Sequence, residues 1–418
     1  MLLYFKVSNY KSFSDEAMLN LVPVRRIVSF PDHLHKMANN ESVSAVGTAV
    51  VFGANASGKT NLVLAMDSSQ SYIVRGVLQD KDIPCASPFL LDKSEADTGS
   101  RFEYGLCTEG HVYNYGFVVK KNIVVEEWLF ESMGNSEKRI FERGLVNGEI
   151  KFEFGKELEA RFANTQVAAV VSDKVLFLTV AGQKDKLLAP VYLWFRDHLM
   201  VIPASERLVC TNLSDVILNH KHFKQFMDEL LRTFDTGVFS FNIEKQDSSN
   251  YKPITIHKRA DLSEIPFDLG MESDGTRQLM NLAPFLFQAK QEEKVVVIDE
   301  LDRSLHSALT RRFIELFHQL AGSSSLHSQL IVTTHDTNLL DSNFLRKDEI
   351  WFMKKTSIAS SQLVCLAEYK VTQGLNFEKG YLAGRFGAIP NLSDLVSLIK
   401  CPPGDQPFQL ERIQHTQK

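Results

Sequence analysis

The segment GANASGKT, from Gly53 to Thr60, constrains the fold more than any other part of the sequence. It follows the β-rich, apolar run SAVGTAVVF and precedes a segment with spaced apolar residues that ends at Gly76, as a helix would. A glycine-rich loop with the spacing G-x-x-x-x-G-K-[ST], placed between a strand and a helix, is typical of phosphate-binding α/β folds. The sequence therefore predicts a sheet of largely buried strands with helices packed around it.

Each residue type in this loop suits the binding of phosphate groups. Gly53 and Gly58 let backbone N–H groups close around an anion. Lys59 places a positive charge on the β- and γ-phosphates, and the Thr60 hydroxyl can coordinate Mg²⁺. A glycine-rich turn without a ligand is the alternative. Both the motif pattern and its position between a strand and a helix disfavour that alternative. We therefore expect ATP and Mg²⁺ as cofactors, with the nucleotide-binding residues Gly53, Ala54, Asn55, Ala56, Ser57, Gly58, Lys59 and Thr60.

Two later apolar runs end on polar residues that complete this chemistry. VVVIDE ends at Asp299, which would hold the magnesium shell with Thr60, and Glu300, which would orient or deprotonate the attacking water. A buried strand that happens to end on acids is the alternative, which the phosphate loop disfavours. LIVTTH places His335 at the carboxyl edge of the sheet, where ligands of such folds bind. A lone histidine is more often structural, but this position favours a catalytic role.

Composition excludes several other classes of protein. The formal net charge of -5 and the pI near 6.2 argue against a general nucleic-acid coat, although not against a local basic patch. The five cysteines are scattered singly, so neither a zinc-binding C-x-x-C pair nor a disulfide framework is indicated, and a cytoplasmic location is expected. The N-terminus does not have the pattern of a signal peptide, and no apolar run is long enough to span a bilayer. We expect no membrane partner.

The succession of patterns predicts an α/β core that is split by an insertion. Residues 1–95 form its first part, and residues 235–370 form its second, where helical and β-rich segments alternate again. Between them, residues 96–234 begin as short strands separated by turns, typical of an antiparallel meander, and continue as helical segments. Residues 371–418 are predicted to be a C-terminal helical extension. The expected fold class is α/β with a mixed sheet, plus the inserted antiparallel β-meander and helical region.

The stretch MESDGTRQL, Met271 to Leu279, has the pattern of a helix N-terminus that could meet an anion. Taken alone, it would be an ordinary capped helix with Ser273 or Asp274 as the N-cap residue. Its position shortly before the acidic strand end at Asp299 favours a functional role instead.

The order of these motifs resembles that of the ABC-type ATPases, specifically the soluble branch with the SMC and OLD proteins. FKVSNYKSF resembles the N-terminal strand of that branch, and the resemblance implies a nucleotide contact for Lys11. It implies an ABC-type P-loop ATPase head in which ESDGT is the signature, DRSLH contains the D-loop and His335 is the H-loop histidine. SPFLLD, in the place of the Q-loop, has no glutamine. The residues implied to act in trans are Ser273, Asp274, Gly275 and Thr276, and those of the D-loop are Leu305 and His306.

The resemblance also implies how subunits and partners are arranged. In ABC ATPases the signature helix faces the γ-phosphate bound by the opposite subunit, so two chains would share two ATP sites. A homodimer of heads or a higher oligomer is therefore expected. The length of the insertion and segments such as YLAGRFGAIP resemble bacterial anti-phage ATPases of the abortive-infection and PARIS-type systems. This implies a separate effector, commonly a nuclease, and a phage-encoded trigger.

Two other classes of function stay open. A DNA-repair or chromosome-associated ATPase would bind DNA directly, which makes DNA a further candidate partner and requires a basic groove. Residues for such a groove exist in the meander, although a solvated strand face explains them as well: Lys120, Lys121, Lys138, Arg139 and Arg143. An interaction scaffold would use ATP only to lock an oligomer, and it would not need Glu300.

Overall fold

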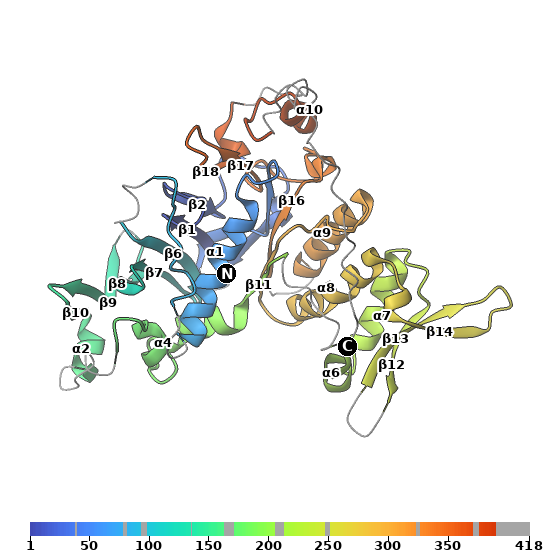
Figure 1. Cartoon of the computed structure of the whole chain (residues 1–418), viewed down its shortest axis with the longest axis horizontal. Helices are drawn as coiled ribbons and strands as arrows, with labels where there is room; N and C mark the ends of the chain where they lie inside the picture. The colour runs from blue at the N-terminus through green and yellow to red at the C-terminus, as the bar shows by residue number, and fades with distance from the viewer. Residues whose placement is uncertain are drawn as a thin grey trace, which may run out of the picture.

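The computed structural model describes residues 1–37, 40–77, 82–92, 98–134, 136–162, 171–204, 213–246, 251–322, 327–370 and 376–389. Two sheets and two sets of helices form successive layers, which run from left to right in Figure 1. An antiparallel sheet forms one outer layer, a mostly parallel sheet lies in the interior, and helices cover the far face of that inner sheet.

The inner sheet has six strands in the order β11-β15-β16-β5-β17-β18. Its first five strands are parallel, and β18 pairs antiparallel with β17 at one edge. In β15, Val295 and Val297 pack into one core, whereas Val296 and Ile298 pack into the other, so both faces of the sheet are buried. The strands are β5 (Thr48–Phe52), β11 (Leu199–Ile202), β15 (Val295–Ile298), β16 (Gln329–Thr334), β17 (Ile350–Lys355) and β18 (Ser361–Cys365).

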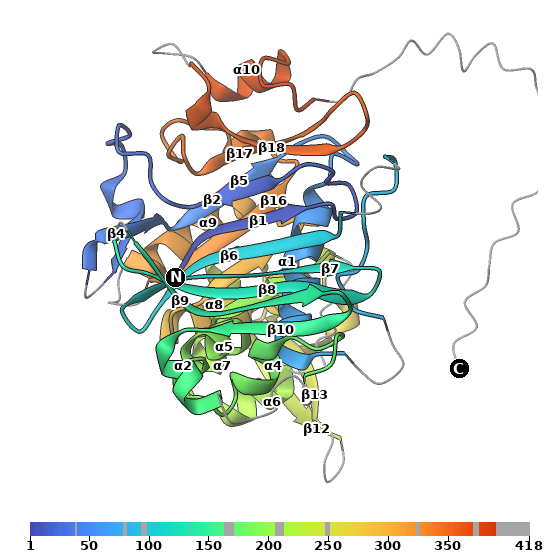
Figure 2. The ribbon, with the colours of Figure 1, turned by 90° about the vertical axis from the view of Figure 1, so that its left-hand side faces the viewer.

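The outer sheet has seven strands in the order β10-β9-β8-β7-β6-β1-β2, and all of its neighbours are antiparallel. The predicted meander supplies β6 to β10, and the two N-terminal strands extend the sheet (Figure 2). The strands are β1 (Leu2–Ser8), β2 (Ala17–Asn20), β6 (Ser100–Thr108), β7 (His111–Lys120), β8 (Ile123–Ser132), β9 (Glu137–Val146) and β10 (Glu149–Phe154).

Helix α1 (Lys59–Arg75) packs in the core between the two sheets. The second core, on the other face of the inner sheet, contains α7 (Phe223–Thr233), α8 (Asp274–Gln291) and α9 (Ser307–Gly322). Shorter helices are α2 (Lys156–Phe162), α4 (Phe177–Ala181), α5 (Ala189–Leu193), α6 (Leu213–Asn219) and α10 (Phe377–Leu382), and a π-helical turn spans Trp194–His198.

Two small sheets complete the described fold. β3 (Leu34–Met37) pairs with β4 (Asn40–Val46), and β13 (Tyr251–Lys258) pairs with both β12 (Ser240–Lys245) and β14 (Glu264–Asp268). The three-stranded sheet projects from the helical side of the molecule in Figure 1 and leads directly into α8.

The α/β fold class with a mixed sheet, an antiparallel meander and a helical region is confirmed, but sheet membership differs from the expected division of the chain. β1 and β2 belong to the meander's sheet, because β1 pairs along its length with β6. β11, within the segment assigned to the insertion, joins the inner sheet beside β15. The domain boundaries stay predictions. Residues 371–375 and 390–418 of the predicted C-terminal extension lie outside the described residues.

The five basic residues of the meander do not form one basic groove. Arg143 is buried, where its guanidinium donates to Val175 O at 2.5 Å and lies 3.4 Å from the Glu127 carboxylate. Lys138 pairs with Glu157 at 2.8 Å, and Arg139 pairs with Glu142 and Glu153. Acidic neighbours therefore neutralise these charges.

Among the described helices, none has the length and apolar character required to cross a bilayer.

Candidate nucleotide site

The phosphate loop lies between β5 and α1, as its pattern predicts. Gly58 has a φ of 109°, and a Cβ there would overlap the Ser361 hydroxyl. A Cβ at Gly53 would lie 2.6 Å from the Met353 carbonyl oxygen. Close backbone packing therefore requires both glycines. The Ser57 hydroxyl in the same loop is buried without a hydrogen-bond partner among the described residues, so the loop retains a polar group for a ligand.

Lys59 directs its amine back over the loop that precedes it. The ammonium nitrogen donates to Gly53 O at 2.8 Å and to Ala54 O at 3.2 Å, and the side chain is buried. Burial lowers the pKa of Lys59 to about 8, although the nearby carboxylates of Asp299, Asp302 and Glu300 act in the opposite direction. A cation of this kind, held among backbone oxygens and facing acids, gains favourable contacts when phosphate arrives.

Asp299 and Glu300 follow β15 directly, and the Thr333 hydroxyl links them to β16. That hydroxyl donates to Asp299 Oδ1 at 2.5 Å and accepts from the Glu300 N–H at 2.8 Å. The other carboxylate oxygen, Asp299 Oδ2, is buried without a hydrogen-bond partner among the described residues. Because Mg²⁺ prefers oxygen ligands, this orphaned oxygen and the exposed Thr60 hydroxyl fit a magnesium shell. Motif analysis of the sequence missed Thr333.

Glu300 has a left-handed backbone conformation, with a φ of 51°. A non-glycine residue in this region is strained, and such residues cluster at functional sites. The chain therefore turns sharply where the inner strand ends, and the Glu300 side chain remains partly exposed.

His335 follows the end of β16 and is exposed. Its backbone N–H donates to Asp302 Oδ2 at 3.1 Å, while Asp302 Oδ1 is buried without a partner among the described residues. Partial desolvation of the ring lowers the pKa of His335, and the charge of Lys59 lowers it further. The imidazole therefore lies within electrostatic reach of Lys59. Asp302 was also missed, although it stands three residues after Asp299 in the sequence.

The N-terminal motif reaches the phosphate loop through Ser12, the residue after Lys11. Ser12 Oγ accepts from Asn61 Nδ2 at 2.8 Å and from the Ser361 hydroxyl at 2.8 Å. Lys11 is exposed, its backbone N–H donates to Ser87 O at 2.7 Å, and its ammonium lies 5.8 Å from the centre of the Tyr10 ring. The nucleotide contact expected of Lys11 stays a prediction.

The ESDGT stretch forms the start of α8, with Ser273 as its N-cap residue. Ser273 Oγ accepts from the Thr276 N–H at 3.1 Å, and Ser273 O accepts from the Arg277 N–H at 3.0 Å. The amides of Asp274 and Gly275 are the remaining donors of the first turn, since helix geometry gives them no intrahelical partner. Ser273 and Asp274 are exposed, so this helix end can meet an anion from outside the chain.

The signature and the predicted D-loop pack against each other within one chain. A Cβ at Gly275 would lie 2.7 Å from Ser304 O and 3.9 Å from the Leu305 side chain. His306 is exposed and accepts from the Ala308 N–H at 3.2 Å through Nδ1, so it orders the start of α9. The two motifs therefore form one continuous surface.

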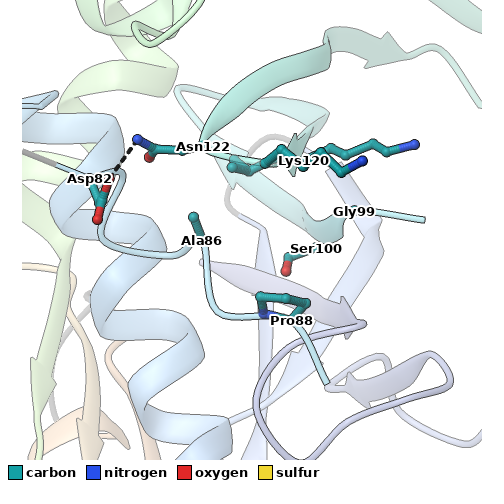
Figure 3. Close-up of a pocket in the computed structure, with 9 residues that line it drawn as sticks. Asp82, Ala86, Pro88, Gly99, Ser100, Lys120 and Asn122 are labelled. Atoms are coloured by element: carbon teal, nitrogen blue, oxygen red, sulfur yellow. Dashed lines mark hydrogen bonds between the residues drawn. The ribbon is translucent and has the colours of Figure 1, made fainter. Parts of the chain in front are cut away.

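A pocket in the described part of the chain lies outside the candidate nucleotide site, beside the turn between β7 and β8. It has a volume of about 260 Å³, and its lining includes Lys120, Lys121 and Asn122. Figure 3 shows Asn122 joined to Asp82 by a hydrogen bond, which measures 2.7 Å. None of the residues predicted to bind nucleotide lines this pocket.

Comparison with known proteins shows the family of the chain. Residues 49–341 match the family described as "AAA domain, putative AbiEii toxin, Type IV TA system". The chain belongs to this AAA-domain family. The match extends from β5 past His335, so it includes the phosphate loop, the signature stretch and the acidic strand end.

Two solved structures that are similar to this AAA-domain chain are SMC heads. One is the SMC head bound to the C-winged helix domain of ScpA, with 13% identity, a TM-score of 0.43, and coverage of 91% of this chain and 99% of that chain. The other is the SMC head domain from Thermotoga maritima, with 14% identity, a TM-score of 0.38, and coverage of 87% and 98%. No curated protein sequence shows significant similarity to the chain.

The AAA domain thus brings the sequence-predicted residues together in two groups. Lys59, Asp299, Glu300 and His335 lie within electrostatic reach of one another at the carboxyl ends of the inner strands. Ser273, Gly275 and Thr276 lie with Ser304 and Leu305 around the start of α8. The catalytic, metal-binding and trans roles assigned to them stay predictions.

Replacing Gly275 by Ala should destabilise the contact between the signature and the D-loop. Alanine normally stabilises a helix relative to glycine by about 1 kcal/mol. Here the added Cβ would lie 2.7 Å from the backbone oxygen of Ser304, so we expect a net loss of about 1–3 kcal/mol, the usual effect of overpacking. Thermal unfolding should show a lower Tm for Gly275→Ala. Gly270→Ala is the control, because a Cβ there meets no atom within 4 Å, and an equal Tm for both variants would contradict the expected clash.

Proposed function

We propose that this chain binds Mg²⁺–ATP and hydrolyses it as an ABC-type ATPase whose sites are shared between two subunits. The observation that carries the proposal is the group at the carboxyl edge of the inner sheet. There, the buried Lys59 amine faces Asp299 with its orphaned oxygen, and Glu300 stands next to it in a strained turn. A cation, a metal-binding carboxylate and a candidate base are the groups that phosphoryl transfer to water requires.

In this proposal each residue has a defined task. The loop amides and Lys59 hold the β- and γ-phosphates, while Thr60 and Asp299 hold Mg²⁺, which when bound neutralises charge on the phosphate oxygens. Glu300 orients the attacking water and accepts its proton. The Thr333 hydroxyl fixes the positions of Asp299 and the Glu300 backbone, so it acts as a positioning residue. His335 contacts the γ-phosphate side of the site.

The exposed start of α8 supports the sharing of sites between subunits. Its remaining amide donors at Asp274 and Gly275 lie on the same surface as the D-loop, and both motifs are accessible to a second chain. The positive end of the α8 dipole favours an anion there. A second copy of the chain would bring its bound γ-phosphate to this helix end, and each subunit would complete the site of the other.

Mixing two inactive variants tests this arrangement. We expect Ser273→Arg to keep ATP binding in the separate subunit and to abolish pairing and hydrolysis, because its bulky side chain blocks the helix end. When Ser273→Arg is mixed with Lys59→Ala, one shared site of each mixed dimer carries both lesions and the other carries neither. ATPase activity and nucleotide-dependent pairing should therefore recover on mixing, up to one active site in two.

The controls for this mixture are each variant alone, which should stay inactive, and Glu264→Arg, which adds a positive charge at an exposed position on β14. Strict cooperation between the two sites could suppress turnover in a mixed dimer, so pairing is measured as well, by light scattering with and without ATP. Absence of both pairing and activity in the mixture would show that the sites are not shared.

We further propose that ATP turnover controls a separate effector, such as a nuclease, in anti-phage defence. The family description names a putative toxin of a type IV toxin–antitoxin system, which supports a role in a system with more than one component. The Glu300→Gln chain, which should hold ATP, is the bait for affinity purification from native cells before and after phage infection. Lys59→Ala is the matched control. A protein enriched with the first bait alone would identify the effector or a phage-encoded trigger.

The same purification tests the alternative, an SMC-like ATPase that binds DNA directly. That function requires a continuous basic surface, whereas Arg143 is buried and Lys138 and Arg139 pair with acids. Recovery of DNA with the bait, without an enriched protein, would favour the alternative over an effector.

A further inference from the structure

A second cluster of polar side chains lies at the opposite edge of the inner sheet. Glu349 directly precedes β17, and Thr48 is the first residue of β5. Because the phosphate loop and His335 follow the carboxyl ends of the parallel strands, these two residues mark the amino-terminal edge, away from the nucleotide site. His33, in the short 3-10 helix Pro31–His33, and His318, in α9, reach the same place.

The cluster is held by short contacts between segments that are far apart in the sequence. His33 Nδ1 lies 3.1 Å and 3.0 Å from the two oxygens of Glu349, which is 316 positions away. The rings of His33 and His318 have centroids 4.2 Å apart, and His318 Nε2 contacts the Thr48 hydroxyl. One nitrogen from each of these two histidines and one Glu349 oxygen all lie within 4.8 Å of one another.

The burial of the cluster suits it for a ligand. Glu349 is fully buried, whereas the His33 side chain is 11% exposed, so an ion could enter from the His33 side. Nearby, His35 Nδ1 is buried without a hydrogen-bond partner among the described residues.

The surroundings hold the Glu349 carboxylate in place. Glu349 Oε2 accepts the Arg346 N–H at 2.8 Å. The Arg346 guanidinium donates two hydrogen bonds of 2.9 Å to Asp348, and its other contacts are to the backbone oxygens of Ile27, Ser29 and Phe30. The second group of donors around a ligand carboxylate normally fixes its orientation in this way.

We propose that His33, His318 and Glu349 bind one divalent transition-metal ion of the zinc class. Two imidazoles and a carboxylate are ligands that zinc accepts, whereas Mg²⁺ and Ca²⁺ prefer oxygen ligands alone. A tetrahedral ion with bonds of about 2.0–2.2 Å needs ligand atoms about 3.3–3.5 Å apart, and side-chain rotation can bring the three atoms from within 4.8 Å to that spacing. Water or the Thr48 hydroxyl completes the shell.

Such an ion would link three separate parts of the fold: the segment before β3, helix α9 and the start of β17. Its effect is structural, since the cluster lies at the edge of the sheet away from the nucleotide site. An ion that binds only the folded chain raises the free energy of unfolding. The proposal does not depend on ATP hydrolysis, so its test uses nucleotide-free protein.

The test is zinc uptake by the full chain after treatment with a chelator and removal of that chelator. We expect wild-type protein to bind one Zn²⁺ per chain, measured by elemental analysis, and its Tm to rise by several degrees with added Zn²⁺. His33→Gln and His318→Gln should each lose the bound ion and the rise in Tm. His111→Gln is the matched control, because it removes a histidine from a His–Glu pair with Glu131 at 2.6 Å that has no third metal-binding side chain among the described residues.

The absorption spectrum of Co²⁺-loaded wild-type protein tests the site even if the variants fail to fold. Nitrogen and oxygen ligation would give a visible band that is stronger than that of aqueous Co²⁺ and no thiolate charge-transfer band. Addition of Zn²⁺ should then remove the visible band. No band, a thiolate band, or no uptake of Zn²⁺ by the wild-type chain would overturn the proposal. Uptake that is equal in wild type and in folded His318→Gln would overturn it as well.

Discussion

Glu300→Gln is expected to bind ATP normally and to hydrolyse it about 100-fold or more slowly, the usual contribution of a positioned general base. The amide keeps the shape of the side chain but cannot accept a proton as a carboxylate does. The backbone at this position is held by the Glu300 N–H bond to the Thr333 hydroxyl at 2.8 Å, which the substitution leaves in place. The ATP-bound pair of chains should therefore accumulate.

The measurement combines steady-state phosphate release, ATP binding by calorimetry and the oligomeric state with ATP. Glu292→Gln, at the exposed end of α8, is the matched control and should behave like wild type. Turnover at the wild-type rate in Glu300→Gln would move the general base elsewhere, with His335 as the next candidate. The scaffold function, in which ATP only locks an oligomer, would instead be favoured by a wild-type chain that binds ATP and does not hydrolyse it.

Lys59→Ala should lower ATP affinity by about tenfold or more, because each charge-assisted contact to phosphate contributes about 1.5–3 kcal/mol. The ammonium is already placed over the loop by Gly53 O and Ala54 O, so it meets the phosphates without rearrangement of the loop. Calorimetric titration with ATP and Mg²⁺ measures the loss. Lys224→Ala, which removes a lysine from a part-buried i,i+4 pair with Asp228 on α7, is the control. Normal ATP binding by Lys59→Ala would refute the phosphate-loop assignment.

The pKa of Lys59 gives this interaction a defined pH dependence. In the nucleotide-free chain the pKa of Lys59 is about 8, so its amine loses a proton as the pH rises through that value. Only the ammonium form binds phosphate well. ATP affinity should fall above pH 8, and binding near this pH should take up protons. Calorimetry in buffers of different ionisation enthalpy would detect that uptake, which Lys59→Ala should lack.

Linkage gives the sign of the matching effect on stability. The folded pKa of Lys59, about 8, is below its ordinary value of 10.5, so the unfolded chain binds more protons between these values. The contribution of Lys59 to the free energy of unfolding therefore rises with pH across this window and is least favourable below pH 8. Denaturant titration of nucleotide-free wild-type and Lys59→Met chains at several pH values would show the difference, and parallel pH profiles would contradict it.

The sequence by itself determined the elements whose signals are local. The glycine pattern and the apolar spacing placed the phosphate loop and a helix ending at Gly76, and α1 indeed ends at Arg75 with Gly76 as its C-cap. The apolar runs before Asp299 and His335 are the buried strands β15 and β16. These predictions succeeded because a strand buried on both faces, a glycine-rich turn and a helix cap depend on neighbouring residues.

Only the tertiary structure decided which distant segments meet. The N-terminal strand β1 could have joined either sheet, since its apolar residues suit both, and pairing with β6 placed it in the meander's sheet. Burial of Arg143 beside Glu127 removed it from the expected basic groove. Thr333 and Asp302 carry no motif of their own, and their contacts to Asp299, Glu300 and His335 arise from adjacent strand ends. The His33–His318–Glu349 cluster likewise exists only because the short 3-10 helix Pro31–His33, helix α9 and the start of β17 meet at one edge of the inner sheet.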